Sequence, residues 1–95
     1  MSKIKKIIRY HASWCKPCHV FEKTFNEAKQ DEKYKDIEFK SVDIESDEGL
    51  EECEKYGIKN IPTTIFLGEN DMFLGKTIGN VPLDKFKNDI DNANQ

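Results

Sequence analysis

The feature that most constrains the fold is a change of hydrophobic period that falls across two closely spaced cysteines. Residues 4–11 are rich in Ile and Tyr and predict a first strand, apolar enough to lie inside a sheet. From Pro17 to about Gln30 the apolar side chains recur at helical spacing, at Cys18, Phe21, Phe25 and Ala28. Proline suits the first helical position, because its missing N–H would have no partner there. The sequence therefore predicts a strand that passes into a helix at the cysteines.

The rest of the chain continues the alternation of strands and helices. Further strands are expected over residues 37–44, 63–67 and 72–78, and further helices over residues 47–56 and from Pro82 onward. Gly57 closes the middle helix, and Asn70-Asp71 forms the turn of a hairpin. The order β-α-β-α-β-β-α predicts one α/β domain over residues 1–95. Its four-stranded mixed sheet is flanked by three helices, which cover both faces.

The composition excludes several classes of function. The formal net charge is −3 and the acidic and basic residues are interspersed, so a nucleic-acid partner is not expected. No apolar run is long enough for a membrane span or a signal peptide, and we expect a cytoplasmic monomer with no membrane partner. Three cysteines in such a chain indicate chemistry rather than a framework of structural disulfides.

The two cysteines of the segment WCKPC occupy unequal positions. Cys15 precedes the helix, where unpaired backbone N–H groups and the positive end of the helix dipole favour a thiolate. Cys18 falls on the apolar helix face, so we expect it to be buried and Cys15 to be exposed. This asymmetry predicts that Cys15 attacks a substrate disulfide and that Cys18 then resolves the mixed disulfide. The exchange requires no metal and no cofactor other than the Cys15–Cys18 disulfide.

Three segments, taken in order, resemble the thioredoxin family. Residues 12–18, ASWCKPC, resemble its active-site motif, and residues 56–63, YGIKNIPT, resemble the segment that carries its cis-proline. Gly79 matches the glycine that flanks its substrate groove. The resemblance implies a thioredoxin fold, a cis Ile61–Pro62 bond that faces the cysteines, and reduction of protein disulfides. It also implies a groove for an extended substrate, lined by Trp14, Lys16, Pro17, Ile61, Pro62, Thr63 and Gly79.

Within that groove, the resemblance implies that the backbone of Ile61 pairs with a substrate strand beside Cys15. Trp14, Ile61 and Gly79 would then form its apolar rim. The electron donor expected for such a protein is a thioredoxin reductase. A glutaredoxin-like protein recharged by glutathione is the alternative, although the Gly-Gly pair typical of glutaredoxins is missing before the last helix.

The chain departs from the family pattern in the first strand. Arg9 stands where the family usually carries a buried aspartate beneath the second cysteine, and Ser41 aligns with the lysine that often accompanies it. A cation there would favour the thiolate and make the disulfide a stronger oxidant, unless Arg9 points away to solvent. Lys16 replaces a commoner glycine, and the strand and helix that begin full-length thioredoxins are missing. In this respect the chain resembles short thioredoxin and glutaredoxin-like proteins.

The cysteines also permit other interpretations. A zinc site would need Cys53, His11 and His19 as further ligands, which is poor support for four-coordinate zinc. The run CKPCH also fits a c-type haem attachment, but the strand–helix order and the Ile61–Pro62 segment have no role in a small cytochrome. A thioredoxin-fold binding subunit with incidental thiols is a third possibility. Cys53 itself is expected to be a packing residue of the middle helix.

Overall fold

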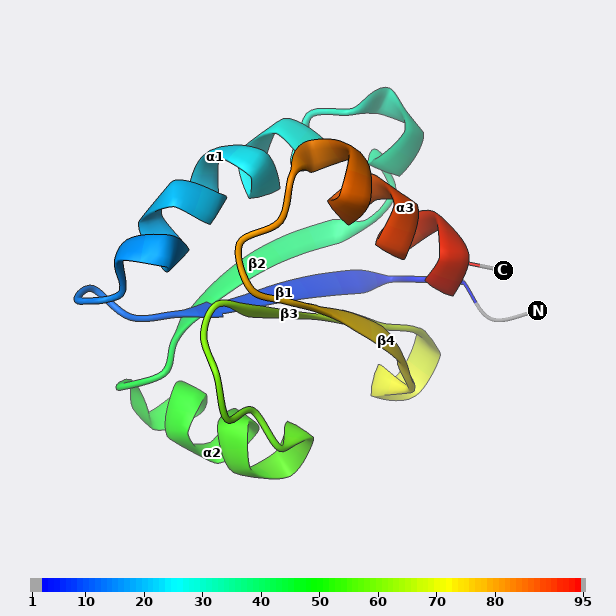
Figure 1. Cartoon of the computed structure of the whole chain (residues 1–95). Helices are drawn as coiled ribbons and strands as arrows, with labels where there is room; N and C mark the ends of the chain where they lie inside the picture. The colour runs from blue at the N-terminus through cyan, green and yellow to red at the C-terminus, as the bar shows by residue number, and fades with distance from the viewer. Residues whose placement is uncertain (1–2, 95) are drawn as a thin grey trace.

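The chain forms one mixed sheet with helices on both sides, as the computed structural model shows for residues 3–94 (Figure 1). The strands are β1 (Lys6–His11), β2 (Glu38–Asp43), β3 (Thr63–Leu67) and β4 (Phe73–Ile78). The helices are α1 (Lys16–Lys29), α2 (Asp47–Tyr56) and α3 (Leu83–Ala93). Within the described range, the sheet has the order β2-β1-β3-β4. The predicted fold class and element order are confirmed.

The register of the sheet places β1 at its centre, between β2 and β3. β1 runs parallel to β2, with Arg9 opposite Ser41, and antiparallel to β3, with Arg9 opposite Thr64. β3 and β4 form the antiparallel hairpin. A parallel pair requires a crossover connection, and α1 supplies it between β1 and β2. The carboxyl end of β1 therefore leads straight into the segment that carries the two cysteines.

Side chains of β1 alternate between two cores, one on each face of the sheet. Ile7 faces α1 and α3, whereas Ile8 and Tyr10 face α2. Figure 1 shows α1 and α3 together on one side of the sheet and α2 alone on the other. Because successive strand residues point to opposite faces, a strand buried on both sides reads as a continuous apolar run.

The core between the sheet and the α1–α3 layer is largely aromatic. Phe86 of α3 lies at its centre, with ring centroids 5.1 Å from Phe21 and 6.3 Å from both Phe25 and Phe66. All four rings are buried. The edge-to-face arrangement of Phe21 and Phe86, at an interplanar angle of 75°, is one that aromatic pairs favour. This cluster anchors α1, and with it Cys18, to the sheet.

Helix α2 begins and ends at residues with clear capping roles. The side chain of Ser46 accepts a hydrogen bond from the N–H of Gly49, 3.0 Å away. Gly57 ends the helix in the left-handed conformation, at φ 65°. Gly49 lets the helix approach the end of β2 closely, since a Cβ there would overlap the carbonyl oxygen of Asp43. The predicted bounds of α2 agree with the structure.

Small differences from the predicted bounds occur at element ends. Helix α1 begins at Lys16, so Pro17 is its second residue rather than its first, and Pro82 caps α3 from outside. A 3₁₀ turn over Glu32–Tyr34 was not predicted. Tyr34 is buried there, with its hydroxyl 2.8 Å from a carboxylate oxygen of Asp91. That contact spans most of the sequence, which explains why local patterns did not reveal it.

Candidate active site

The first turn of α1 is capped by the sulfur of Cys15. Cys15 has an extended backbone conformation, and its Sγ accepts a hydrogen bond from the N–H of Cys18 at 3.2 Å. The loop before it is held by bonds from the N–H of Cys15 to the carbonyl of Ala12, at 3.1 Å, and between His19 Nε2 and the carbonyl of Ser13, at 2.7 Å. One otherwise unpaired helix N–H thus points at the sulfur. Such a donor stabilises negative charge on that atom.

Cys15 and Cys18 are joined by a disulfide, with their Cα atoms 5.3 Å apart. Cys18 is buried, with 1% of the residue exposed, as its helix face predicts. Cys15 is also buried, with 5% exposed, so the expectation of an exposed Cys15 is wrong for the disulfide form. The cause is tertiary: Ala12, Ile44 and Ile61 pack around the two cysteines. Only Ala12 of these three is near them in the sequence.

The loop before β3 brings Ile61 to the disulfide. The Ile61–Pro62 peptide bond is cis, which confirms the prediction from the resemblance. Ile61 packs against the cluster of Ala12 and the two cysteines. The carbonyl of Pro62 accepts a hydrogen bond from the N–H of Gly79 at 2.8 Å, so the third predicted segment joins the same region. Within residues 3–94, the backbone of Ile61 has no hydrogen bond of its own.

The remaining predicted groove residues fall into two groups. Trp14, Lys16 and Pro17 are exposed beside the disulfide, and Trp14 retains 65% of its surface. Thr63 is buried, and its hydroxyl donates a 2.6 Å hydrogen bond to the carbonyl of Asn60. The side chain of Thr63 therefore shapes the loop from within.

Arg9 lies beneath the first turn of α1 and does not reach solvent. The residue is 5% exposed, so the reading in which it points away is wrong. Its Nε donates to Ser41 Oγ and its Nη1 to the carbonyl oxygen of Cys18, both at 3.1 Å. The guanidinium carbon lies 5.5 Å from the centroid of the Phe25 ring. A buried cation is thus bonded to the backbone of the second cysteine.

Burial shifts the pKa values of two ionisable side chains, His11 and Cys53. Burial lowers the pKa of His11, at the end of β1, and the charge of Arg9 lowers it further. Burial is the main cause that raises the pKa of the free Cys53 thiol, and the negative charge of Glu52 raises it further. Cys53 packs with the core on the α2 side of the sheet, as expected for a packing residue. A thiol with a raised pKa is a poor nucleophile, and this separates Cys53 from the pair at α1.

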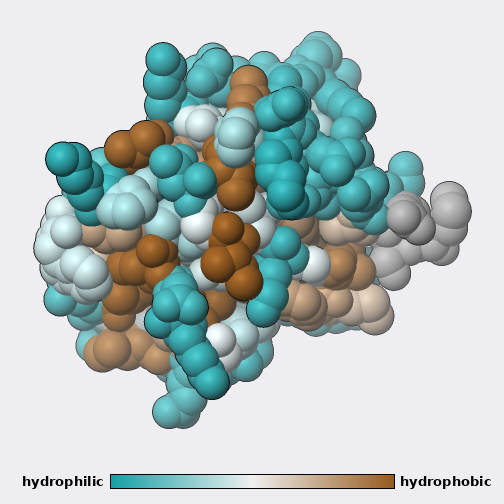
Figure 2. Space-filling model, in the orientation of Figure 1, coloured by the Kyte–Doolittle hydropathy of each residue, from teal (hydrophilic) through white to brown (hydrophobic). Residues whose placement is uncertain are grey.

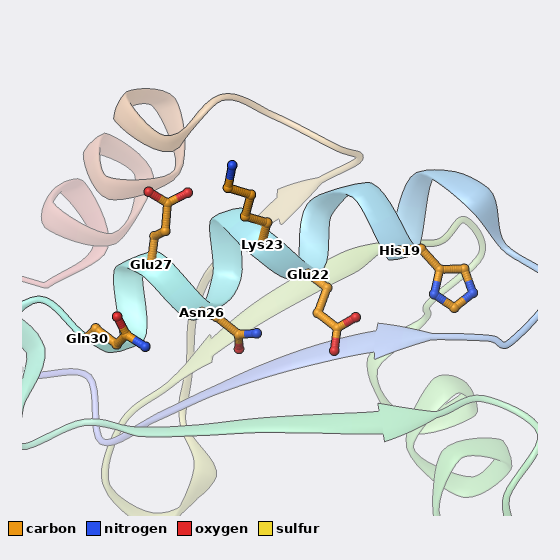
Figure 3. A pocket seen from close by; sticks show the side chains of 6 residues that line it. All are labelled: His19, Glu22, Lys23, Asn26, Glu27 and Gln30. Carbon is orange, nitrogen blue, oxygen red and sulfur yellow. The ribbon is translucent and has the colours of Figure 1, made fainter.

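In the described part of the chain, no metal centre lies beside the disulfide. No group of three or more His, Cys, Asp and Glu side chains among residues 3–94 could hold a metal ion. No helix in the same range is long and apolar enough to cross a membrane. A shallow hollow runs along the outer surface of α1, and Figure 3 shows its polar lining, which comes from that one helix and its cap. Its residues are His19, Glu22, Lys23, Asn26, Glu27 and Gln30.

Two contributors to the site were missed by sequence reasoning. Ile44, just after β2, packs against the cysteines, and Phe25 lies against Arg9. The helical period identified Phe25 as a core residue but could not show that a cation lies beside it. The sequence pattern places Ile44 at the end of a strand, and only the parallel β1–β2 pairing reveals its position, through a 2.9 Å hydrogen bond from its N–H to the carbonyl of His11.

Comparisons with known proteins agree with this geometry. The family model described as Thioredoxin matches residues 1–92. A thioredoxin of Mycoplasmoides gallisepticum is 36% identical over 83 residues, which are 87% of this chain and 78% of that protein.

Solved structures show the same fold. The thioredoxin of Malassezia sympodialis aligns over 93% of this chain and 73% of its own, with a TM-score of 0.79 at 24% identity. The oxidized form of mitochondrial Thioredoxin 3 from Saccharomyces cerevisiae aligns over 94% and 79%, with a TM-score of 0.75 at 27% identity.

Proposed function

This chain belongs to the thioredoxin family and is a dithiol–disulfide oxidoreductase, and on that premise we propose that Cys15 is its nucleophile and Cys18 its resolving thiol. The observation that carries the assignment is the hydrogen bond from the N–H of Cys18 to Cys15 Sγ. The donor is fixed by the helix and acts on one sulfur alone. Cys18, deeper in the core, has no such donor among the described residues.

The reaction proceeds in two exchanges. The thiolate of Cys15 attacks one sulfur of a substrate disulfide, the substrate S–S bond breaks, and the departing sulfur leaves as a thiolate that takes up a proton. Cys18 then loses its proton and attacks Cys15 Sγ, which breaks the mixed disulfide and releases the second substrate thiol. The substrate gains two electrons and two protons, and the protein gains the Cys15–Cys18 disulfide.

The substrate class we propose is a disulfide in an extended protein segment. The unpaired backbone of Ile61 can form strand-like hydrogen bonds with such a segment, next to the buried cysteines. Trp14, Ile61 and Gly79 form the apolar rim, while Lys16, Pro17, Pro62 and Thr63 shape the groove. Backbone pairing gives affinity without demanding a particular substrate sequence, so we expect broad use of protein disulfides.

We further propose that residues 1–95 act as a single domain and a monomer in the cytoplasm. A protein that donates electrons from a dithiol, and that carries a free thiol at Cys53, suits a reducing compartment. Figure 2 shows the apolar residues of one face divided into small areas by hydrophilic side chains, so that face has no large apolar interface.

A thioredoxin reductase is the electron donor we expect, with glutathione as the alternative. The test is turnover of insulin disulfides, run in parallel with NADPH and a thioredoxin reductase, and with glutathione and glutathione reductase. We expect sustained turnover with the reductase and at least about tenfold less with glutathione, a difference of about 1.4 kcal/mol in activation free energy. The control is the same protein after heating with reductant and alkylation, which blocks its cysteines. Faster turnover with glutathione would assign the chain a glutaredoxin-like role instead.

A further inference from the structure

Arg9, the one buried cation among residues 3–94, is held next to the redox centre from three directions. Arg9 comes from the central strand β1, and its guanidinium bonds β2 through Ser41 Oγ and α1 through the carbonyl of Cys18. The third contact is the ring of Phe25. A long flexible side chain with these anchors has a fixed position, so its charge lies at a constant place beneath the first turn of α1.

The charge of Arg9 is poorly compensated by its surroundings. Among residues 3–94, no carboxylate forms an ion pair with Arg9. Burial lowers the pKa of Arg9, and the charge of Glu22, an exposed residue of α1, opposes that change. Figure 3 shows Glu22 and His19 as neighbouring side chains of that helix.

The other elements around Arg9 add little negative charge. On β1, His11 interacts with Arg9, and on β2 the nearby carboxylate is that of Asp43, which interacts with His11. On β3 the partner in register is Thr64, a neutral residue whose hydroxyl is buried without a hydrogen-bond partner in the described part of the chain. Among the described residues, Arg9 is therefore the one buried charge below the cysteines, and the carboxylates around it are not buried.

We propose that Arg9 is a positioning residue that fixes the carbonyl of Cys18 and, through its permanent charge, favours the reduced over the oxidised form of the Cys15–Cys18 pair. This inference rests on the proposed function, because it treats the pair as a working redox couple. A disulfide is neutral, whereas the reduced pair can carry negative charge on sulfur. A nearby cation thus stabilises only the reduced form, and the disulfide becomes the more oxidising. Arginine retains its proton throughout the physiological range, so the effect is present wherever the reduced pair carries a thiolate.

A purely structural role for Arg9 makes a different prediction. Its hydrogen bonds to Ser41 and Cys18 involve a hydroxyl and a carbonyl, and neither group changes in the redox step. Loss of those bonds would destabilise both forms of the protein by similar amounts and leave the redox equilibrium unchanged. Only the charge distinguishes the two forms.

The test measures the equilibrium of the protein disulfide and two glutathione molecules with the protein dithiol and glutathione disulfide. The fraction of each form is read by acid quenching, alkylation and mass spectrometry. Arg9→Met and Arg9→Gln remove the charge, and the glutamine can still donate a hydrogen bond. Arg9→Lys keeps the charge, and Ser41→Ala removes one anchor while leaving the guanidinium in place.

We expect both neutral variants to shift the equilibrium about tenfold toward the disulfide, which is a potential about 30 mV more negative for this two-electron couple. Arg9→Lys and Ser41→Ala should stay within about threefold of the parent, or about 15 mV by the same conversion. If Arg9→Met does not fold, Arg9→Gln decides. Neutral variants that match the parent would overturn the proposal, as would a lysine variant that shifts as far as they do. The measurement needs no protein substrate. A failed insulin-reduction assay would therefore count against the proposed function without changing the result of this equilibrium measurement.

Discussion

Replacing Cys15 with serine is expected to abolish reduction of protein disulfides. The first exchange requires a sulfur nucleophile, and a serine hydroxyl neither ionises near neutral pH nor forms a disulfide. We expect the rate of insulin reduction by Cys15→Ser to fall by about a thousandfold or more, to the rate of the reductant alone. We expect no other thiol to substitute, because Cys18 lies deeper and lacks the helix N–H donor of Cys15 Sγ, and because burial raises the pKa of Cys53.

The matched control for this variant is Cys53→Ser, which removes the third thiol on the opposite face of the sheet. Its rate should lie within about twofold of the parent, since surface or half-buried substitutions away from a site have small effects. The assay follows precipitation of the insulin B chain at equal concentrations of each variant. If Cys15→Ser keeps a substantial fraction of the parental rate, or Cys53→Ser loses most of it, the assignment of the nucleophile is wrong.

Replacing Phe86 with alanine is expected to have the largest effect on stability. Phe86 is fully buried between rings contributed by α1 and β3, and its removal leaves a cavity that α3 cannot close without leaving the sheet. Such a change costs about 3–5 kcal/mol of unfolding free energy. A domain of this size has about 5–15 kcal/mol in total, so the variant retains little stability.

Urea unfolding of the oxidised protein measures this loss directly. The control is Phe73→Ala on β4, which removes the same ring from a residue that is 48% exposed. We expect less than about 1.5 kcal/mol from that change, because much of the ring is already in water. Equal losses for the two variants would show that the aromatic cluster around Phe86 does not anchor α1 and α3 in the way described above.

The sequence was most informative where a single local pattern governs the structure. The switch from the strand pattern of residues 4–11 to the helical spacing after Pro17 places the cysteines at a helix start, and the structure adds that Cys15 Sγ itself caps the helix. The turn at Asn70-Asp71 was also predictable. Both residues adopt a left-handed conformation, with φ of 57° and 58°, which Asn and Asp tolerate better than most.

Features that depend on contacts between distant segments were harder to predict. The burial of Cys15 arises from Ile44 and Ile61, which reach it only after the sheet has formed. The orientation of Arg9 stayed open, because a shift of one residue in a strand reverses the face that a side chain occupies. The pairing of Arg9 with Ser41 across β1 and β2 determines that face.

The most direct test of the central claim is to trap the intermediate of the first exchange. The double variant Cys18→Ser, Cys53→Ser retains Cys15 as its only thiol and is mixed, after reduction, with a peptide that contains one disulfide. We predict a stable mixed disulfide of one peptide chain per protein, mapped to Cys15 by tryptic digestion and mass spectrometry without reductant. The matched variant Cys15→Ser, Cys53→Ser, in which Cys18 is the only thiol, should form at least about tenfold less adduct in the same time, because Cys18 lies deeper than Cys15 and its sulfur lacks the helix N–H donor that Cys15 Sγ has. Equal or greater adduct formation at Cys18 would contradict the account.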